Sequence, residues 1–400
     1  MNRSLSLKCL VVLACTANAL RAGPFMGQYK GTFYPDQVVT MPATATVVDE
    51  GDGDYRINLH AKPDDPALEG AHIEIMGREF GPLVHLSSRA GGYDWRGEIQ
   101  NGRLVARSQY GQRFEMEKIV SKSPRAGAKP PKEAVILLPF KEGVRADLSG
   151  WTNTEWKARP NGVMECAKGK GANKTKREFS NIKQLHVEFR LPLEPHGRGQ
   201  HRANSGVYVL DAYEVQILDS FGIMHTSGDC GGIYNLKRTT VNKCLPPLTW
   251  QTYDITFRPA RLDDNGKVKE LPEMTVVFNG TTIHDKLKIP KNRHRTKGPI
   301  QLQDHGHSIQ FRNIWLVLAQ HQGTTPRLGN APVKALPCFA LKPHPRDRHG
   351  IDGKLQPDAF VQGARILRCG PGFVINHAEM PIGILVNAIH DAAQKNLAPF

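Results

Sequence analysis

The chain has 400 residues, of which 40% are hydrophobic and 23% charged, and its formal net charge is +15. A chain of this length and hydrophobic content can fill the cores of two ordinary domains, which excludes a disordered polymer. No basic segment is interleaved with aromatic residues in the way of nucleic-acid-binding modules, so nucleic acid is not an expected partner.

The first residues have the three parts of an export signal. Arg3 and Lys8 form a basic start, residues 9–20 are apolar, and small residues at 17–19 or Ala22 offer a cleavage site. We therefore predict a signal peptide over residues 1–22 and a secreted or periplasmic mature protein. Lipoprotein processing at Cys15 is the less favoured alternative, because it would leave a shortened apolar region. No run is long enough to span a bilayer, so no transmembrane segment is expected.

The mature protein stays basic. Removing residues 1–22 takes away Arg3, Lys8 and Arg21 and no acidic residue, so the charge falls from +15 to +12. For an exported protein this charge favours an anionic glycan or cell wall as partner. A basic surface that is merely solvated is the alternative.

Residues 23–120 predict a small antiparallel β domain. Short alternating runs, such as residues 55–59 and 113–119, are separated by Gly and Asp turns, and Asn101-Gly102 predicts a hairpin between residues 95–99 and Leu104. Trp95 or Tyr29 could contact a carbohydrate, but packing in the core is the favoured role for both. The next segment, residues 121–133, is rich in Pro, Gly and cations and predicts a linker between two domains.

A second run of β signals follows this linker. Residues 184–191 alternate throughout between polar and apolar side chains. This pattern places Leu185 and Val187 on the face toward the core and His186, Glu188 and Arg190 on the opposite, polar face, which we call the polar floor. Further strands are expected at 206–210, 213–218, 252–257, 274–278 and 309–318, with a hairpin turn at Asn279-Gly280. Many short strands and few helical periods predict an all-β, two-sheet jelly-roll sandwich, preceded by the small antiparallel β domain.

The remaining residues, 321–400, form a C-terminal extension of unknown role, with one short helix predicted near residues 385–395. Five cysteines follow the predicted signal: Cys166, Cys230, Cys244, Cys338 and Cys369. An odd number leaves at least one thiol unpaired within a monomer. Cys230 and Cys244 flank a Gly-rich basic loop and could close a disulfide, and buried free thiols are the alternative. The sequence has no Cys/His spacing of a zinc site.

Three polar clusters interrupt the apolar strands of the second domain, at residues 204–220, 298–306 and 309–314. The first contains Asn-Ser-Gly-Val-Tyr followed by Tyr-Glu-Val-Gln-Ile-Leu-Asp-Ser, the second is Gly-Pro-Ile-Gln-Leu-Gln-Asp-His-Gly, and the third contains Phe-Arg-Asn-Ile. Together with the segments 149–152, 161–164, 230–234 and 250–255, these motifs resemble the 3-keto-disaccharide hydrolase family over residues 134–320.

This resemblance implies a concanavalin-like lectin/glucanase sandwich and a specific chemistry. The substrate would be a 3-keto-glycoside, cleaved by a lyase and hydratase route. A ketone at C3 acidifies the C2 hydrogen, so a base can remove it, the enolate can expel the C1 substituent, and water can then add to the double bond. Such a site needs a base, an acid for the leaving oxygen, and donors that face the enolate.

Four residues suit the catalytic roles. Glu214 is the first candidate for the base and His305 for the acid, although the two roles could be exchanged. Asp304 could orient His305 or act as a second carboxylate. The planar guanidinium of Arg312 offers several N–H donors for the enolate or for a sugar oxygen. The alternatives are a capped turn at residues 304–306 and a structural role for Arg312. The predicted substrate-binding residues are Gln216, Asn204, Tyr208, Asp219, Gln303 and Glu188.

The strand that carries Glu214 departs from the glucanase pattern Glu-x-Asp-x-x-Glu. Here the spacing is Glu214-x-Gln216-x-x-Asp219, and the central acid is an amide, which argues against a retaining carboxylate pair. No cofactor is expected. A divalent ion bound by His305, His307 and Asp304 is a low-ranking alternative. The rival function is a non-catalytic lectin-like module that binds an anionic polysaccharide.

Overall fold

The computed structural model describes residues 23–62, 70–290, 294–319, 366–368 and 374–376. The chain divides into two compact units, Met1–Gly323 and Thr324–Phe400. In the second unit the structure describes only the paired strands β23 (Ile366–Arg368) and β24 (Val374–Asn376). The predicted signal peptide and the helix near 385–395 lie outside the described residues, so export stays a prediction.

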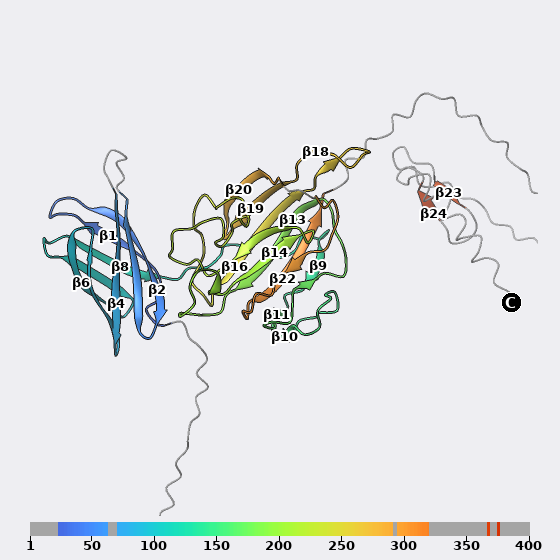
Figure 1. The fold of residues 1–400 in the computed structure, drawn as a ribbon. Helices are drawn as coiled ribbons and strands as arrows, with labels where there is room; N and C mark the ends of the chain where they lie inside the picture. Colours follow the sequence, from blue (N-terminus) through green and yellow to red (C-terminus); the bar gives the residue numbers. More distant parts are fainter. Residues whose placement is uncertain (1–22, 63–69, 291–293, 320–365, 369–373, 377–400) are drawn as a thin grey trace, which may run out of the picture. The chain divides into compact units, whose positions relative to one another are not determined.

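The first eight strands close into an antiparallel barrel in which each strand pairs with its neighbours in sequence and β1 pairs with β8 (Figure 1). They are β1 (Gly27–Tyr34), β2 (Met41–Gly51), β3 (Asp54–Ala61), β4 (Ala71–Phe80), β5 (Leu83–Ala90), β6 (Tyr93–Gln100), β7 (Arg103–Ser108) and β8 (Arg113–Ile119). The Asn101-Gly102 turn joins β6 to β7 with positive φ at both residues, as a type I′ turn requires. Trp95 and Tyr29 are each 1% exposed inside the barrel, so neither offers a surface to a carbohydrate.

The second domain is a sandwich of two antiparallel sheets. The large sheet runs β10-β11-β22-β13-β16-β19-β20, with β9 paired to β22, and Figure 1 shows its central strands side by side. Its strands are β9 (Val135–Leu138), β10 (Lys157–Arg159), β11 (Val163–Glu165), β13 (Ile182–Arg190), β16 (Trp250–Arg258), β19 (Glu273–Phe278), β20 (Thr281–Lys288) and β22 (Gln310–Leu318). The small sheet runs β12 (Asn173–Lys174), β21 (Gln301–Leu302), β14 (Ser205–Val209) and β15 (Tyr213–Ile217).

Two short elements complete the described part of this domain. The strands β17 (Arg261–Leu262) and β18 (Val268–Glu270) form a separate ribbon, and η1 (Gly199–His201) is a single 3₁₀ turn. The expected two-sheet, all-β architecture is confirmed; the jelly-roll connectivity stays a prediction. In the part of the chain that the structure describes, no helix has the length and apolar character to cross a bilayer.

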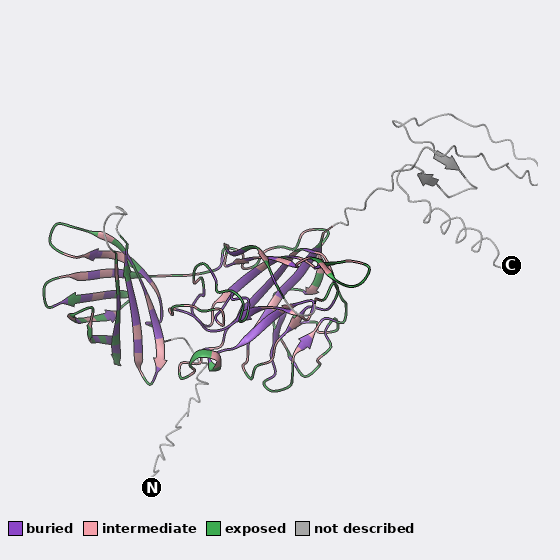
Figure 2. Cartoon of the chain, turned by 45° about the horizontal axis from the view of Figure 1, so that its top comes forward, coloured by how far each residue is buried: buried purple, intermediate pink, exposed green. Residues whose placement is uncertain are grey.

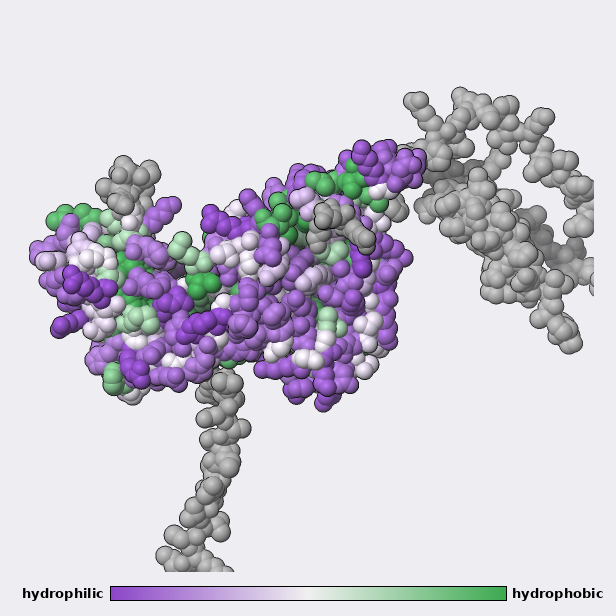
Figure 3. Space-filling model, in the orientation of Figure 1, coloured by the Kyte–Doolittle hydropathy of each residue, from purple (hydrophilic) through white to green (hydrophobic). Residues whose placement is uncertain are grey.

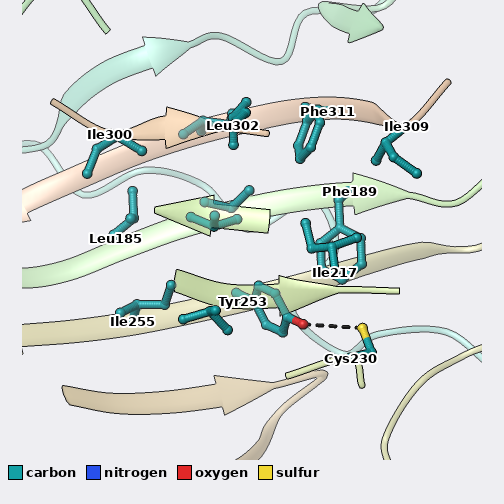
Figure 4. Close-up of a cluster of buried hydrophobic side chains, with 14 of the residues drawn as sticks. Leu185, Phe189, Ile217, Cys230, Tyr253, Ile255, Ile300, Leu302, Ile309 and Phe311 are labelled. Atoms are coloured by element: carbon teal, nitrogen blue, oxygen red, sulfur yellow. Dashed lines mark hydrogen bonds between the residues drawn. The ribbon is translucent and has the colours of Figure 1, made fainter. Parts of the chain in front are cut away.

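The core of the sandwich lies between the two sheets. Figure 4 shows Phe189, Tyr253 and Phe311 of the large sheet gathered with Ile217 and Leu302 of the small sheet. Each aromatic side chain buried in this way contributes roughly 1.5–3 kcal/mol. Figure 2 shows the buried residues concentrated on the strands and the exposed ones in the loops, and the face in Figure 3 is mainly hydrophilic with small separate apolar patches.

The cysteines within the described residues are free thiols. Cys166, Cys230 and Cys244 are all buried, and no disulfide joins Cys230 to Cys244. The Cys230 sulfur instead lies 3.2 Å from the Tyr253 hydroxyl, the contact drawn in Figure 4. Of the two alternatives for this pair, the structure therefore has the buried thiols.

Candidate active site

The candidate site lies on the outer face of the small sheet. Along β15, Val215 and Ile217 point into the core, so the alternating residues Glu214 and Gln216 share the opposite face. In β14 the same alternation places Tyr208 outward, and the strand register sets Tyr208 directly opposite Glu214. Sequence periodicity was therefore sufficient to place these three side chains on one surface.

Gly206 makes room for the carboxylate. A Cβ atom at Gly206 would overlap the Glu214 Oε1 atom and would lie 3.2 Å from Glu214 Cδ. Because a glycine stands opposite Gln216 in the register, the Glu214 side chain can lie flat across the small sheet. Any larger residue at position 206 would displace this carboxylate.

Tyr208 contacts both Glu214 and the neighbouring strand β21. Gln303 follows β21, donates from Nε2 to the Tyr208 hydroxyl at 3.2 Å, and binds the Gly206 carbonyl through its backbone N–H at 3.0 Å. Burial, followed by the charge of the hydrogen-bonded Glu214 carboxylate, raises the pKa of Tyr208. The phenol therefore stays protonated at neutral pH and can donate a hydrogen bond beside Glu214.

Side-chain amides form the other side of the site, and we call Gln200, Asn204, Gln216 and Gln303 the amide cluster. The Gln200 Oε1 atom accepts from Asn204 Nδ2 and from Gln216 Nε2, both at 3.0 Å. The Nε2 atoms of Gln200 and Gln216 also share the Gly228 carbonyl, at 2.8 and 3.2 Å. Gln200 thus connects the two predicted residues Asn204 and Gln216.

Three oxygens of the amide cluster are buried and accept no hydrogen bond: Asn204 Oδ1, Gln216 Oε1 and Gln303 Oε1. Asn204 is 2% exposed and Gln216 is 1% exposed. Buried acceptors are normally satisfied, and each one left without a donor costs about 1–3 kcal/mol. These acceptors lie on the sheet face that carries Glu214, and the hydroxyl donors of a sugar would reach them only after the groups that cover them move.

Asp304 and His305 lie on the turn that follows Gln303. Asp304 accepts from the backbone N–H groups of Gly306 at 2.9 Å and Gly171 at 2.8 Å. Burial opposes ionisation of Asp304, but these backbone hydrogen bonds hold its pKa below the ordinary value. Asp304 therefore caps the turn and ties it to the neighbouring loop, whereas His305 is exposed at its tip. His305 stands on the turn that follows β21, two residues after Gln303, and its ring contacts that of His307.

Arg312 and Glu188 lie elsewhere. They are register partners on β22 and β13, and their side chains share the outer face of the large sheet, across the core from Glu214. Arg312 Nε donates to Glu188 Oε2 at 2.7 Å, and its guanidinium stacks 4.1 Å from the centre of the Trp250 ring. The predicted grouping of Arg312 and Glu188 with Glu214 is therefore wrong in space, because the two sheets present opposite outer faces.

The polar floor predicted around His186 and Glu188 is covered. Both residues are 0% exposed, since the segment 121–133 packs over this face of the large sheet. The Gly127 N–H donates to Glu188 Oε1 at 2.5 Å, and Arg125 binds Asp254, which holds His186 Nδ1 at 2.9 Å. This floor is an internal ionic cluster and not a ligand surface.

Asp219 is also withdrawn from the candidate site. Its carboxylate is buried and accepts from Arg202 Nε at 2.7 Å and from the Phe221 N–H at 3.2 Å. Burial raises the pKa of Asp219 even against the Arg202 charge. The spacing Glu214-x-Gln216-x-x-Asp219 therefore does not return a second carboxylate to face Glu214.

The residues proposed for a divalent ion have other contacts. His307 Nδ1 lies 2.6 Å from Glu194 Oε2, and the ring of His305 stacks on that of His307 at 6.4 Å. Across the described ranges, no group of three or more His, Cys, Asp and Glu side chains is arranged to hold a metal ion.

Sequence reasoning missed Gln200. This residue lies in η1, outside any strand, so no periodicity places it, and its partner Gln216 is 16 positions away. Three cavities of about 410, 480 and 580 Å³ are lined in part by strands of the barrel, and Glu214 does not line any of these three.

The second domain is an all-β sandwich, and comparison with known proteins gives its family. Residues 141–317 match the 3-keto-alpha-glucoside-1,2-lyase-like domain and belong to that family. The family match supports a carbohydrate-active function for this domain. No curated protein matches the chain.

Two solved structures from Parabacteroides distasonis, both named as candidate glycosyl hydrolases, are similar to part of the chain. The first is 31% identical, covers 47% of this chain and 85% of its own, and has a TM-score of 0.43. The second is 14% identical, covers 50% of this chain and 98% of its own, and has a TM-score of 0.35.

Proposed function

We propose that the sandwich cleaves glycosides whose sugar carries a ketone at C3. The observation that carries this proposal is the Glu214 carboxylate, held against the Tyr208 phenol and beside three buried amide oxygens that lack donors. The amide oxygens would accept the sugar hydroxyls, and the carboxylate would meet the acidic C2 hydrogen. The family match supports the same substrate class.

The reaction starts with proton removal. Glu214 takes the C2 proton, and the electron pair of the C2–H bond moves into an enolate whose oxygen is the former C3 ketone. Once Glu214 holds the C2 proton, the Tyr208 phenol, which burial keeps protonated by raising its pKa, can turn its single O–H from Glu214 to the enolate oxygen. We assign this role to Tyr208 in place of Arg312, which lies on the other sheet.

Elimination and hydration complete the reaction. The enolate expels the substituent at C1, and its departing oxygen takes a proton from His305, the assigned acid, as the C1–O bond breaks. Water then adds to the C1=C2 bond, with its hydroxyl on C1 and a proton on C2. The net change is a glycoside plus water giving a 3-keto sugar and an alcohol.

Ordinary retaining hydrolysis fits this strand less well. It needs a second carboxylate about 5–5.5 Å from the first. Gln216 is an amide, and Asp219 is bound to Arg202. Glu214 therefore suits proton abstraction better than double displacement.

The test uses 4-nitrophenyl 3-keto-glucosides of both anomers, with the unoxidised 4-nitrophenyl glucosides beside them. We expect nitrophenol release from at least one keto substrate and a primary isotope effect when C2 carries deuterium. Glu214→Gln should lower kcat by about 10²–10⁴-fold, the usual share of a general base. Glu178→Gln, an exposed change in the same domain, is the matched control.

Three results would count against the proposal. Turnover of the unoxidised glucosides at the same rate would indicate ordinary hydrolysis. Full activity of Glu214→Gln would remove the base from this residue. Binding of an anionic polysaccharide without turnover of any keto substrate would identify the sandwich as a lectin-like module.

A further inference from the structure

The segment 198–204 carries two members of the amide cluster, Gln200 and Asn204, and it is held from two sides. On the sandwich side, Gln200 binds Asn204 and Gln216, and the Ala203 N–H donates to Glu194 at 2.9 Å. Ala203 has a φ of +50°, in the left-handed region that alanine rarely adopts. A non-glycine residue keeps this conformation only where the surrounding contacts enforce it.

The strongest of these contacts pass through Arg202, whose side chain is 8% exposed. Its Nε donates to Asp219 at 2.7 Å, its Nη1 to the Pro195 carbonyl at 3.1 Å, and its Nη2 to the carbonyl of Asp49 at 2.9 Å. Asp219 follows β15, whereas Asp49 belongs to β2 of the barrel. One guanidinium therefore connects the barrel to the strand that carries Glu214.

Glu50 adds a carboxylate at the same place. Its side chain is 10% exposed, and its oxygens lie 2.8 Å from Arg56, 2.8 Å from Arg198 and 3.7 Å from Arg202. Arg198 also donates to the Glu50 carbonyl at 3.1 Å. Removing this carboxylate would leave the largely buried guanidiniums of Arg56 and Arg202 without this acceptor, which is the costly way to break a buried ion pair.

Close backbone contact surrounds these charges. Gly222 has a φ of +69°, and a Cβ atom there would come within 2.6 Å of Val48 and 2.9 Å of Thr46 in β2. Its carbonyl accepts from Arg56 at 3.0 Å and also from Asn58 in β3. The barrel strands β2 and β3 therefore meet the loop after β15 as well as the segment 198–204.

We propose that the barrel is a positioning module for the sugar site. Glu50 and the Asp49 carbonyl hold Arg198 and Arg202, and these hold the segment in the conformation in which Gln200 binds both Asn204 and Gln216. Glu50 and Arg202 are positioning residues, since neither belongs to the amide cluster. This inference rests on the proposed function, and it adds a role for the first domain.

The experiment compares Glu50→Ala with wild type in the mature full-length protein, by two measurements. Hydrogen exchange without substrate should be at least tenfold faster over residues 198–204, while exchange in the strands β13 and β16 stays unchanged. With the keto substrate, KM should rise about five- to tenfold with kcat nearly constant, because the amides bind ground state and transition state alike. Glu50→Gln, which keeps an acceptor oxygen, should recover part of both effects.

Glu98→Ala changes an exposed carboxylate on β6 of the barrel and should behave as wild type in both measurements. Unchanged exchange over residues 198–204 in a folded Glu50→Ala protein would overturn the inference, and so would faster exchange with an unchanged KM. If wild type turns over no keto substrate, the proposed function fails, and the exchange measurement alone then decides whether the barrel holds the segment.

Discussion

His186 lies at the centre of the ionic cluster on the outer face of the large sheet, between Asp254 at 2.9 Å and Glu188 at 3.5 Å. Burial opposes its charge, but hydrogen bonds to these two carboxylates raise the pKa of His186 above its ordinary 6.5. Burial also works against the charge of Asp254, yet hydrogen bonds from His186 and Arg125 lower the pKa of Asp254 to about 2. The cluster is therefore most stable when the histidine is protonated and the carboxylates are ionised.

These shifts predict a pH window for the free energy of unfolding. Because the pKa of His186 is higher in the folded protein than in the unfolded chain, its protonation stabilises the fold below pH 6.5. This stabilisation is lost as the pH rises through the pKa that His186 has in the folded state. The lowered pKa of Asp254 contributes ~2 kcal/mol above its ordinary value of 3.8, and this is lost as the pH falls toward 2. Urea unfolding of wild type and His186→Asn should therefore differ most between about pH 4 and 6.5.

Above that range the difference between the two proteins should shrink. His85→Asn, an exposed change on the barrel, should leave the pH profile as in wild type. A difference that stays constant from pH 5 to 9 would show that His186 does not carry its proton in the folded state.

At the scale of single elements, two barrel strands have glycines where neighbouring backbones come closest. A Cβ atom at Gly31 in β1 would overlap the Glu115 carbonyl oxygen, and one at Gly97 in β6 would overlap that of Val105. Neither glycine has a positive φ, so close approach and not backbone conformation requires the missing side chain. The missing side chains let β1 approach β8 and β6 approach β7.

Gly97→Ala should therefore destabilise the barrel by about 1–3 kcal/mol, because the methyl group has to push backbone atoms apart. Arg96→Ala, an exposed change at the preceding position, should cost less than about 0.5 kcal/mol. Hydrogen exchange of the β6 and β7 amides at increasing denaturant concentration measures both variants. Equal stability of Gly97→Ala and wild type would mean that β6 and β7 can separate without loss.

At the scale of the whole molecule, the segment 121–133 belongs physically to the sandwich. Besides the contacts of Arg125 and Gly127, the Ala128 carbonyl accepts from Asn313 at 2.9 Å, and Ser123 binds Thr252 at 2.7 Å. The Pro- and Gly-rich composition predicts a linker. In the structure this segment also packs over the ionic cluster of His186, Glu188 and Asp254.

A fragment of residues 134–320 should consequently unfold at a lower temperature than one of residues 121–320. Removal of the segment leaves Glu188 and Asp254 without part of their donors, at a cost of about 2 kcal/mol or more, which corresponds to about 4–8 °C for a domain of this size. Lys122→Ala in the longer fragment is a control that should not change its midpoint. Equal midpoints for the two fragments would contradict a stabilising role for residues 121–133.

Local periodicity was enough to predict the β strands and part of the site. The alternation of residues 184–191 predicted β13, and that of 213–218 placed Glu214 and Gln216 together, because side chains in a strand point alternately to opposite faces. The Asn279-Gly280 turn was equally local, with a positive φ at both residues. The resemblance to the family was also visible in the order of motifs along the chain, and the family match covers residues 141–317.

Contacts between distant residues required the tertiary structure. Which polar strand face is buried depends on what packs over it, so the sequence could not show that residues 121–133 cover His186 while Glu214 faces outward. The sequence also could not show that Arg312 binds Glu188 across the core from Glu214. Two further contacts could not be foreseen from it: Arg202 binds Asp219, and Gln200 joins Asn204 to Gln216. Those contacts depend on the pairing and packing of sheets, which bring together residues that no local pattern relates.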